Sequence, residues 1–149
     1  MKNKVAVKMY EKYIKGTVEK EVVVDKLYLV TILTKAVIKG LNLSEDKVYL
    51  NTRVLKHLYD RKPAEEFECI ICNLHKIVHY PDFVYKNKSP KRGDFCFTKK
   101  IKDTNYFCSI ERGEDRMFIV TVFRIRKGKE GYIKNYELLW SWEDDVPPS

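Results

Sequence analysis

Three side chains spaced four residues apart, Arg53, His57 and Arg61, could together bind an anion and exchange a proton. Apolar spacing predicts a short helix over residues 51–63, and in a helix residues four apart share one face. A histidine between two cations is expected to have a lowered pKa, because repulsion disfavours its charged form. The trio would offer positive charge and a titratable proton to a phosphodiester. The alternative is a solvated basic face on which the histidine is incidental.

A second candidate anion site is the turn-rich stretch over residues 85–93. It holds a tyrosine and four cations, Lys86, Lys88, Lys91 and Arg92. Flexible cations in a loop gain from counterion release when they contact phosphates, without a fixed geometry. We therefore predict phosphate binding by Lys88, Lys91 and Arg92 together with Arg53 and Arg61. The alternative is a solubilising hairpin loop.

The late, strand-like part of the chain holds three more candidates. Thr121 and Arg124 lie in one apolar run, and strand alternation puts Thr121 on one face with Ile119 and Phe123, opposite Arg124. They can serve one site only if a bulge or a sheet edge brings them together. Tyr136 could stack on a base or relay a proton.

A possible metal motif was weighed in the predicted helix over residues 63–79. Cys69, Cys72, His75 and His79 have the spacing C-x2-C-x2-H-x3-H. Residues three apart drift around a helix, so these four cannot all surround one tetrahedral ion without a break in the helix. We therefore predict no metal ligands here and interpret the cysteines as small reduced side chains packed near the helix surface.

Length, composition and charge limit the class of protein. With 149 residues, 44% of them hydrophobic, the chain suits one domain with a real core. A formal net charge of +8 indicates an acidic partner, such as nucleic acid or an anionic surface. No secretory signal is visible, and no apolar run approaches the length of a membrane span. We expect a cytoplasmic protein with no membrane partner and four reduced cysteines.

Periodicity predicts helices early in the chain and strands late. The segment over residues 4–14 is undecided. Helices are predicted over 27–38, 51–63 and 63–79. Strands are predicted at 22–24, 47–50, 83–85, 94–98, 106–110, 117–126 and 133–142. This order predicts an α+β fold, with N-terminal helices packed on one face of a four- to five-stranded antiparallel sheet. We divide the chain into an N-terminal extension over 1–44, a core over 45–142 and a frayed acidic tail over 143–149.

Several short motifs in a fixed order give the chain a family resemblance. They are a Val-Leu-Lys-His helix at 54–57, an Asn-Leu-His-Lys-Ile-Val-x-Tyr-Pro-Asp stretch at 73–82, an Arg-Gly-Asp-Phe hairpin at 92–95, a Thr-x-Phe-Arg strand at 121–124 and a Tyr-x-x-Asn-Tyr-Glu-Leu-Leu-Trp-Ser-Trp ending at 132–142. Together they resemble the phage members of the Barnase–EndoU–colicin–RelE nuclease superfamily, over about residues 45 to 142. The resemblance implies an antiparallel sheet preceded by helices and RNA cleavage without a metal or any other cofactor.

The resemblance also implies roles for particular residues. Enzymes of that superfamily generally use the 2′-hydroxyl of the RNA as nucleophile and leave a cyclic phosphate. The helix histidine of the family maps onto His57, and its strand positions map onto Thr121, Arg124 and Tyr136. His57 would then exchange the proton, Tyr136 would be the complementary acid, and the cations would hold the phosphate.

The sequence thus predicts an endoribonuclease of phage or toxin type, with RNA as substrate and an acidic immunity or antitoxin protein as a candidate partner. One alternative is a non-catalytic nucleic-acid-binding or phage interaction module, which would bind RNA or DNA in a salt-sensitive way and leave it intact. Another is a metal-binding adaptor, which would carry stoichiometric zinc.

Overall fold

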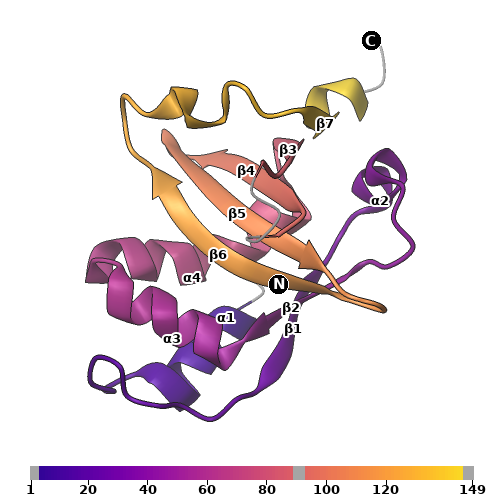
Figure 1. Ribbon diagram of the computed structural model, residues 1–149. Coiled ribbons are helices and arrows are strands. Elements are labelled where there is room, and N and C mark those ends of the chain that lie inside the picture. Colours follow the sequence, from indigo (N-terminus) through magenta and orange to yellow (C-terminus); the bar gives the residue numbers. More distant parts are fainter. Residues whose placement is uncertain (1–3, 89–92, 146–149) are drawn as a thin grey trace.

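Seven strands form one sheet in residues 4–88 and 93–145, the parts of the chain that the computed structural model describes (Figure 1). The strands are β1 (Leu27–Ile32), β2 (Lys47–Asn51), β3 (Phe83–Lys86), β4 (Phe95–Ile101), β5 (Thr104–Arg112), β6 (Met117–Ile125) and β7 (Leu138–Ser141). The helices are α1 (Val5–Met9), which continues into the π-helical turn η1 (Tyr10–Ile14), α2 (Lys35–Leu41), α3 (Thr52–Arg61), α4 (Ala64–His79) and the 3-10 turns η3 (Glu130–Ile133) and η4 (Trp142–Asp145).

The strand order is β1-β2-β6-β5-β4-β3-β7. The mixed α+β class is as predicted, but four to five strands was too few. The sheet is also not purely antiparallel, because β2 runs parallel to β6, pairing Val48 with Met117 and Tyr49 with Phe118. The other pairs in the described sheet are antiparallel. This parallel pairing joins the early antiparallel pair β1–β2 to the later strands.

The first residues of the two central helices favour a helix start at these positions. Asn51 is the N-cap of α3, and its side chain accepts a hydrogen bond from the Arg53 backbone N–H at 2.7 Å. Pro63 immediately precedes α4, and two glutamates in its first turn complement the helix dipole. α3 packs on β2 and β6, and α4 packs on β1, β4, β5 and β6. No helix in the described residues is long and apolar enough to cross a bilayer.

The helix predicted over residues 27–38 is wrong. Residues 27–32 form strand β1, paired with β2, and the helix α2 begins only at Lys35, where the Thr34 hydroxyl accepts the Val37 N–H at 3.3 Å. The run includes the β-branched residues Val30, Thr31 and Ile32, which suit a strand better than a helix. Residues 22–24, predicted as a strand, form none in the described structure.

A bulge in β6 changes which residues share a face. Ser109 pairs with Thr121 but Ile110 pairs with Ile119, so Val120 is an extra residue. Ile119 therefore lies on the face of Val122 and Arg124, and its predicted place beside Thr121 is wrong.

The strand predicted over 133–142 is shorter than expected. Only residues 138–141 form β7, whereas 130–133 form a 3-10 turn, and the Tyr136 N–H donates to the Ile133 carbonyl at 3.0 Å. The backbone before β7 is therefore occupied by local turn hydrogen bonds.

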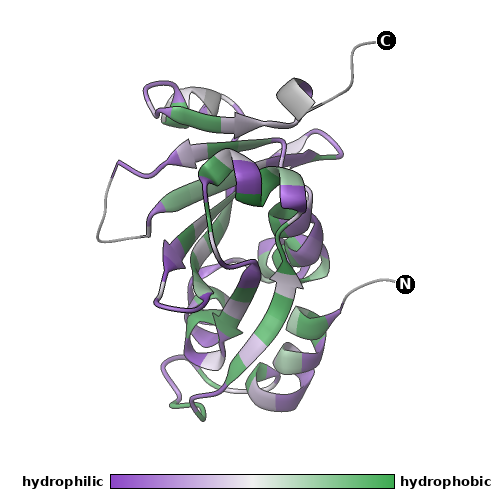
Figure 2. Cartoon of the chain, turned by 90° about the vertical axis from the view of Figure 1, so that its right-hand side faces the viewer, coloured by the Kyte–Doolittle hydropathy of each residue, from purple (hydrophilic) through white to green (hydrophobic). Residues whose placement is uncertain are grey.

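Buried side chains from the N-terminal helices and from the sheet belong to one cluster. Met9 and Ile14 lie in it together with Leu55 of α3, Phe67 of α4 and Cys108 of β5. In Figure 2 the strands carry much of the hydrophobic colouring, and the connecting loops are mainly hydrophilic. Residues 5–14 are thus packed on the same core as the later elements.

Candidate active site

The Arg53–His57–Arg61 trio lies on the solvent-facing side of α3. All three side chains are exposed, and Arg53 lies 3.7 Å from the exposed carboxylate of Asp25. His57 lines neither of the two cavities described below. The helix therefore presents a solvated basic face. The trio is not part of either cavity.

Arg124 and Thr121 lie on opposite faces of the sheet. The Arg124 guanidinium is on the helix side, where Nη1 donates to Glu65 Oε1 at 3.0 Å and Nη2 lies 2.7 Å from Glu65 Oε2. The paired carboxylate raises the pKa of Arg124, and the arginine lowers the pKa of Glu65. Thr121 is paired with Ser109 and faces away from α4. These two residues do not share a site, as strand alternation predicted.

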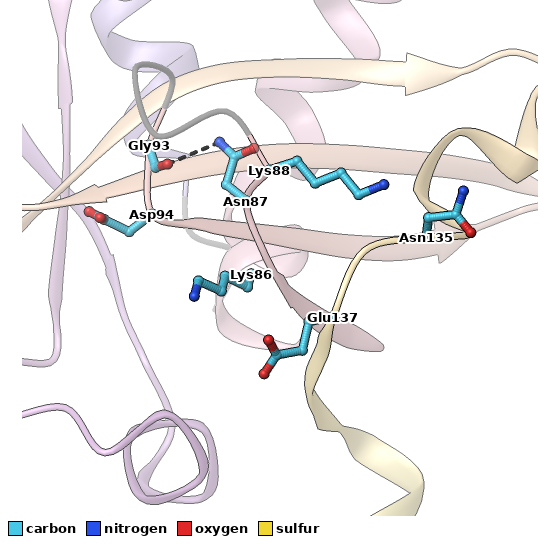
Figure 3. A pocket seen from close by; sticks show the side chains of 7 residues that line it. All are labelled: Lys86, Asn87, Lys88, Gly93, Asp94, Asn135 and Glu137. Carbon is cyan, nitrogen blue, oxygen red and sulfur yellow. Dashed lines mark hydrogen bonds between the residues drawn. The ribbon is translucent and has the colours of Figure 1, made fainter.

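Tyr136 lies beside Lys88, whose Nζ is 5.2 Å from the centre of the tyrosine ring. Close by, the ends of β3 and β4 and the segment before β7 enclose a cavity of about 430 Å³ (Figure 3). In that view Lys88 reaches from the end of β3 towards Asn135. The structure thus brings together two of the predicted site residues, Tyr136 and Lys88. Neither lies on α3, the helix that carries His57. The predicted phosphate ligands Lys91 and Arg92 lie outside the described residues.

A second cavity, of about 390 Å³, lies where segments from four parts of the chain meet. We call it the Trp groove; its lining residues are Thr34, His79, Tyr80, Pro81, Asp82, Lys99, Trp140 and Trp142. Thr34 caps α2, His79 ends α4, Lys99 belongs to β4, and Trp140 belongs to β7. The groove combines an imidazole, an ammonium group, hydroxyl groups and aromatic rings.

The ring of His79 has a defined orientation. Its Nδ1 lies 2.6 Å from the backbone carbonyl oxygen of Ile32. A carbonyl oxygen can only accept a hydrogen bond, so Nδ1 carries the hydrogen and Nε2 of the neutral ring has a lone pair. The Tyr80 ring packs edge-on against His79, with centroids 4.3 Å apart. A histidine held in this way can accept a proton at Nε2.

Asp82 holds the other side of the groove together. Its carboxylate accepts hydrogen bonds from Lys99 Nζ at 3.2 Å and from the Lys100 backbone N–H at 2.8 Å. Its carbonyl accepts the Trp142 N–H at 3.0 Å. One residue thus places the ammonium group of Lys99 and the backbone of Trp142. Lys99 is positioned to add positive charge to an anion in the groove.

His75 lies one helical turn before His79, and the two rings stack with centroids 5.0 Å apart. Its Nδ1 is buried and has no hydrogen-bond partner among the residues that the structure describes. Burial lowers the pKa of His75, and the charge of His79 lowers it further. The lowered pKa favours the neutral form of His75, and the stacked ring restricts the positions that the half-buried His79 can take.

The cysteines make no metal centre with these histidines in the described residues, where no group of three or more His, Cys, Asp or Glu side chains could hold an ion. Cys69 is only 3.5 Å from Glu65, and burial together with that carboxylate raises the pKa of its thiol. Cys96 is buried in the sheet, and burial raises its pKa to about 12. These thiols are poor nucleophiles at neutral pH.

Sequence reasoning missed the Trp groove. His79 was considered only as a metal ligand. The available signal was the run His79-Tyr80-Pro81-Asp82 at the end of a helix, followed by two closely spaced tryptophans at the end of the chain. Their meeting depends on strand pairing between β3 and β7, which leaves no local pattern.

A family model places this chain among known proteins. The model of the family described as phage-Barnase-EndoU-ColicinE5/D-RelE like nuclease 3 matches residues 28–131. The chain belongs to this family of nucleases. The match includes His57, His79 and Lys99, begins inside the predicted 1–44 segment and ends before Tyr136. No curated protein and no solved structure matches the chain.

Proposed function

We propose that the protein is an endoribonuclease that cleaves RNA without a metal ion, and that the Trp groove is its active site. The observation that carries this proposal is an oriented histidine beside a lysine, in one cavity of a chain from a nuclease family. Cleavage through the 2′-hydroxyl needs a base, an acid and a cation near the phosphate. The groove supplies all three types of group.

In the proposed reaction His79 Nε2 accepts the proton of the 2′-hydroxyl. The 2′-oxygen attacks the adjacent phosphorus, the bond from phosphorus to the 5′-oxygen breaks, and that oxygen takes up a proton. The products are a 2′,3′-cyclic phosphate and a free 5′-hydroxyl. Lys99 offsets the charge that builds on the phosphate, and the Tyr80 hydroxyl is the proton donor that lines the same cavity.

The assignment made from sequence differs, because it gives proton exchange to His57 and Tyr136, with Thr121 and Arg124 in the same site. These four residues come from α3, from the segment before β7 and from two faces of β6. In our proposal the exposed cations instead contact the RNA backbone outside the groove. These are Arg53, Arg61 and Lys88, together with Lys91 and Arg92 from the predicted basic loop.

The experiment compares purified variants on a labelled RNA in the presence of a chelator. We expect the wild type to release a cyclic-phosphate product and His79→Ala to be slower by about 10²–10⁴-fold, the usual contribution of a general base. His57→Ala is the matched control, because it removes an exposed histidine from another helix. An RNA with a single 2′-deoxy substitution at the cleavage point should be resistant.

Each result favours one assignment. If His57→Ala or Tyr136→Phe abolishes cleavage while His79→Ala is active, the site assigned from sequence is right and the groove is wrong. Binding of RNA without cleavage by the wild type would reject the catalytic proposal and favour a nucleic-acid-binding module.

We also infer an acidic protein partner. A basic chain of net charge +8 that cleaves cellular RNA needs a neutralising protein, and opposite charge would speed its capture. An acidic protein encoded beside it that blocks cleavage in the assay above would support this inference.

A further inference from the structure

Two of the large aromatic side chains of the Trp groove are strongly exposed. The exposed fraction is 56% for Tyr80 and 47% for Trp142, although rings of this size usually bury most of their surface. The backbone N–H of Trp142 donates a hydrogen bond to the Asp82 carbonyl, which fixes the backbone at this position. Trp140 is half-buried against α2, where its indole ring would clash with a Cβ added to Gly40. The groove therefore has a packed floor and exposed rings at its rim.

This combination of groups fits a nucleobase. A base has a flat π-face on both sides, and stacking on an aromatic side chain needs no particular sequence. The phosphate attached to that nucleoside would find the ammonium group of Lys99, which lines the same cavity. A purely apolar ligand would leave Lys99 and Asp82 desolvated without new partners, which is unfavourable.

We propose that the Trp groove binds one unpaired nucleobase stacked on Trp142 and Tyr80, so that the protein acts on single-stranded segments of RNA. The bases of an A-form duplex are stacked on one another and cannot reach an aromatic ring, whereas loops and ends can place a base outside the stack. The inference rests on the proposed function for the identity of the ligand as RNA. The inference adds to the proposed function the position of the base site and the single-stranded form of the substrate.

The tryptophans themselves report on this site, because the only two in the chain are Trp140 and Trp142 and both line the groove. The probe is a single-stranded 2′-O-methyl RNA hexamer, which lacks the nucleophile and cannot be cleaved by the proposed route. We expect saturable quenching of tryptophan fluorescence by the single strand, and much weaker quenching by the same sequence in a blunt duplex.

Variants then test the stacking. For Trp142→Ala, followed by the anisotropy of a dye on the hexamer, we expect binding weaker by about 5- to 150-fold, the range of one stacked base. Leu138→Ala is the matched control, because Leu138 is in β7 and 50% exposed but does not line the groove. Circular dichroism checks that both variants fold.

The outcomes separate the two proposals. Equal binding of single strand and duplex, or a Trp142→Ala variant that binds like Leu138→Ala, would overturn the base site even if the protein cleaves RNA. Tight, Trp142-dependent binding by a wild type that cleaves no RNA would support the base site and reject the proposed catalysis.

Discussion

Replacing Lys56 by Met should destabilise the protein strongly, because Lys56 is the buried link between α3 and residues 15–26, the loop between η1 and β1. Its Nζ donates to the Asp60 carboxylate and to the Val18 carbonyl, each at 2.6 Å. The side chains of Lys56 and Asp60 are only 6% and 12% exposed. Asp60 also accepts the Lys20 N–H at 3.0 Å, so the variant leaves a buried carboxylate that is only partly satisfied.

The expected loss follows from that geometry. Removing one partner of a buried ion pair costs about 3–5 kcal/mol, and the remaining Lys20 contact puts our expectation at the lower end, about 3 kcal/mol. For a domain of this size that corresponds to a fall in Tm of about 6–12 °C. The assay is urea and thermal unfolding followed by circular dichroism at pH 7. Lys62→Met is the control, because its pair with Glu66 is longer, 3.9 Å, and should contribute under about 1 kcal/mol.

The same pair predicts a dependence on pH. Burial alone would raise the pKa of Asp60, but the hydrogen bonds from Lys56 and from the Lys20 backbone lower it overall. The contribution of the pair is therefore complete above the ordinary aspartate pKa and is lost as the pH falls through the lowered value. The difference between wild type and Lys56→Met should shrink in acid. A loss no larger than that of Lys62→Met at pH 7 would refute this reasoning.

Three further variants test features of the site. Burial lowers the pKa of His75, so the folded protein favours the neutral ring. The stability of the protein should therefore fall as the pH drops from about 7 through the lowered pKa. His75→Phe should flatten that part of a Tm–pH curve. Arg124→Met should lower stability, because it breaks the ion pair with Glu65, but it should change cleavage by the folded protein by less than about threefold. If Arg124 instead stabilised the transition state, its loss would slow cleavage by about 10²–10³-fold. Gly40→Ala should displace Trp140, seen as a shift in tryptophan emission, and weaken hexamer binding.

The helices and the late antiparallel strands could be predicted because their signals are local. Asn51 and Pro63 mark the starts of α3 and α4, and short turns separate β4, β5 and β6. β1 could not be recognised in the same way, since the apolar run from Leu27 fits a buried helix as well as a strand. The pairing of β1 with β2 and the parallel pairing of β2 with β6 make this segment a strand, and both pairings join residues that are distant in the sequence.

The candidate site was harder to predict for the same reason. The spacing of Arg53, His57 and Arg61 correctly placed them on one helix face, but a shared face is not a cavity. His79 became a candidate only through its hydrogen bond to Ile32 and through the cavity it shares with Lys99 and the two tryptophans, all distant in the sequence. The bulge at Val120 also has no clear sequence signal, because Val120 lies in an apolar run that only Thr121 interrupts.

The position of β7 has a consequence for when the groove exists during folding. β7 follows the other six strands of the described sheet in sequence, and it supplies Trp140 and leads into Trp142 at one edge of the sheet. Pairings between distant segments form late, since the loop-closure entropy must be overcome first. A chain still emerging from the ribosome would therefore have α3, α4 and most of the sheet but no groove. Any activity of the groove would begin only after synthesis of the last strand.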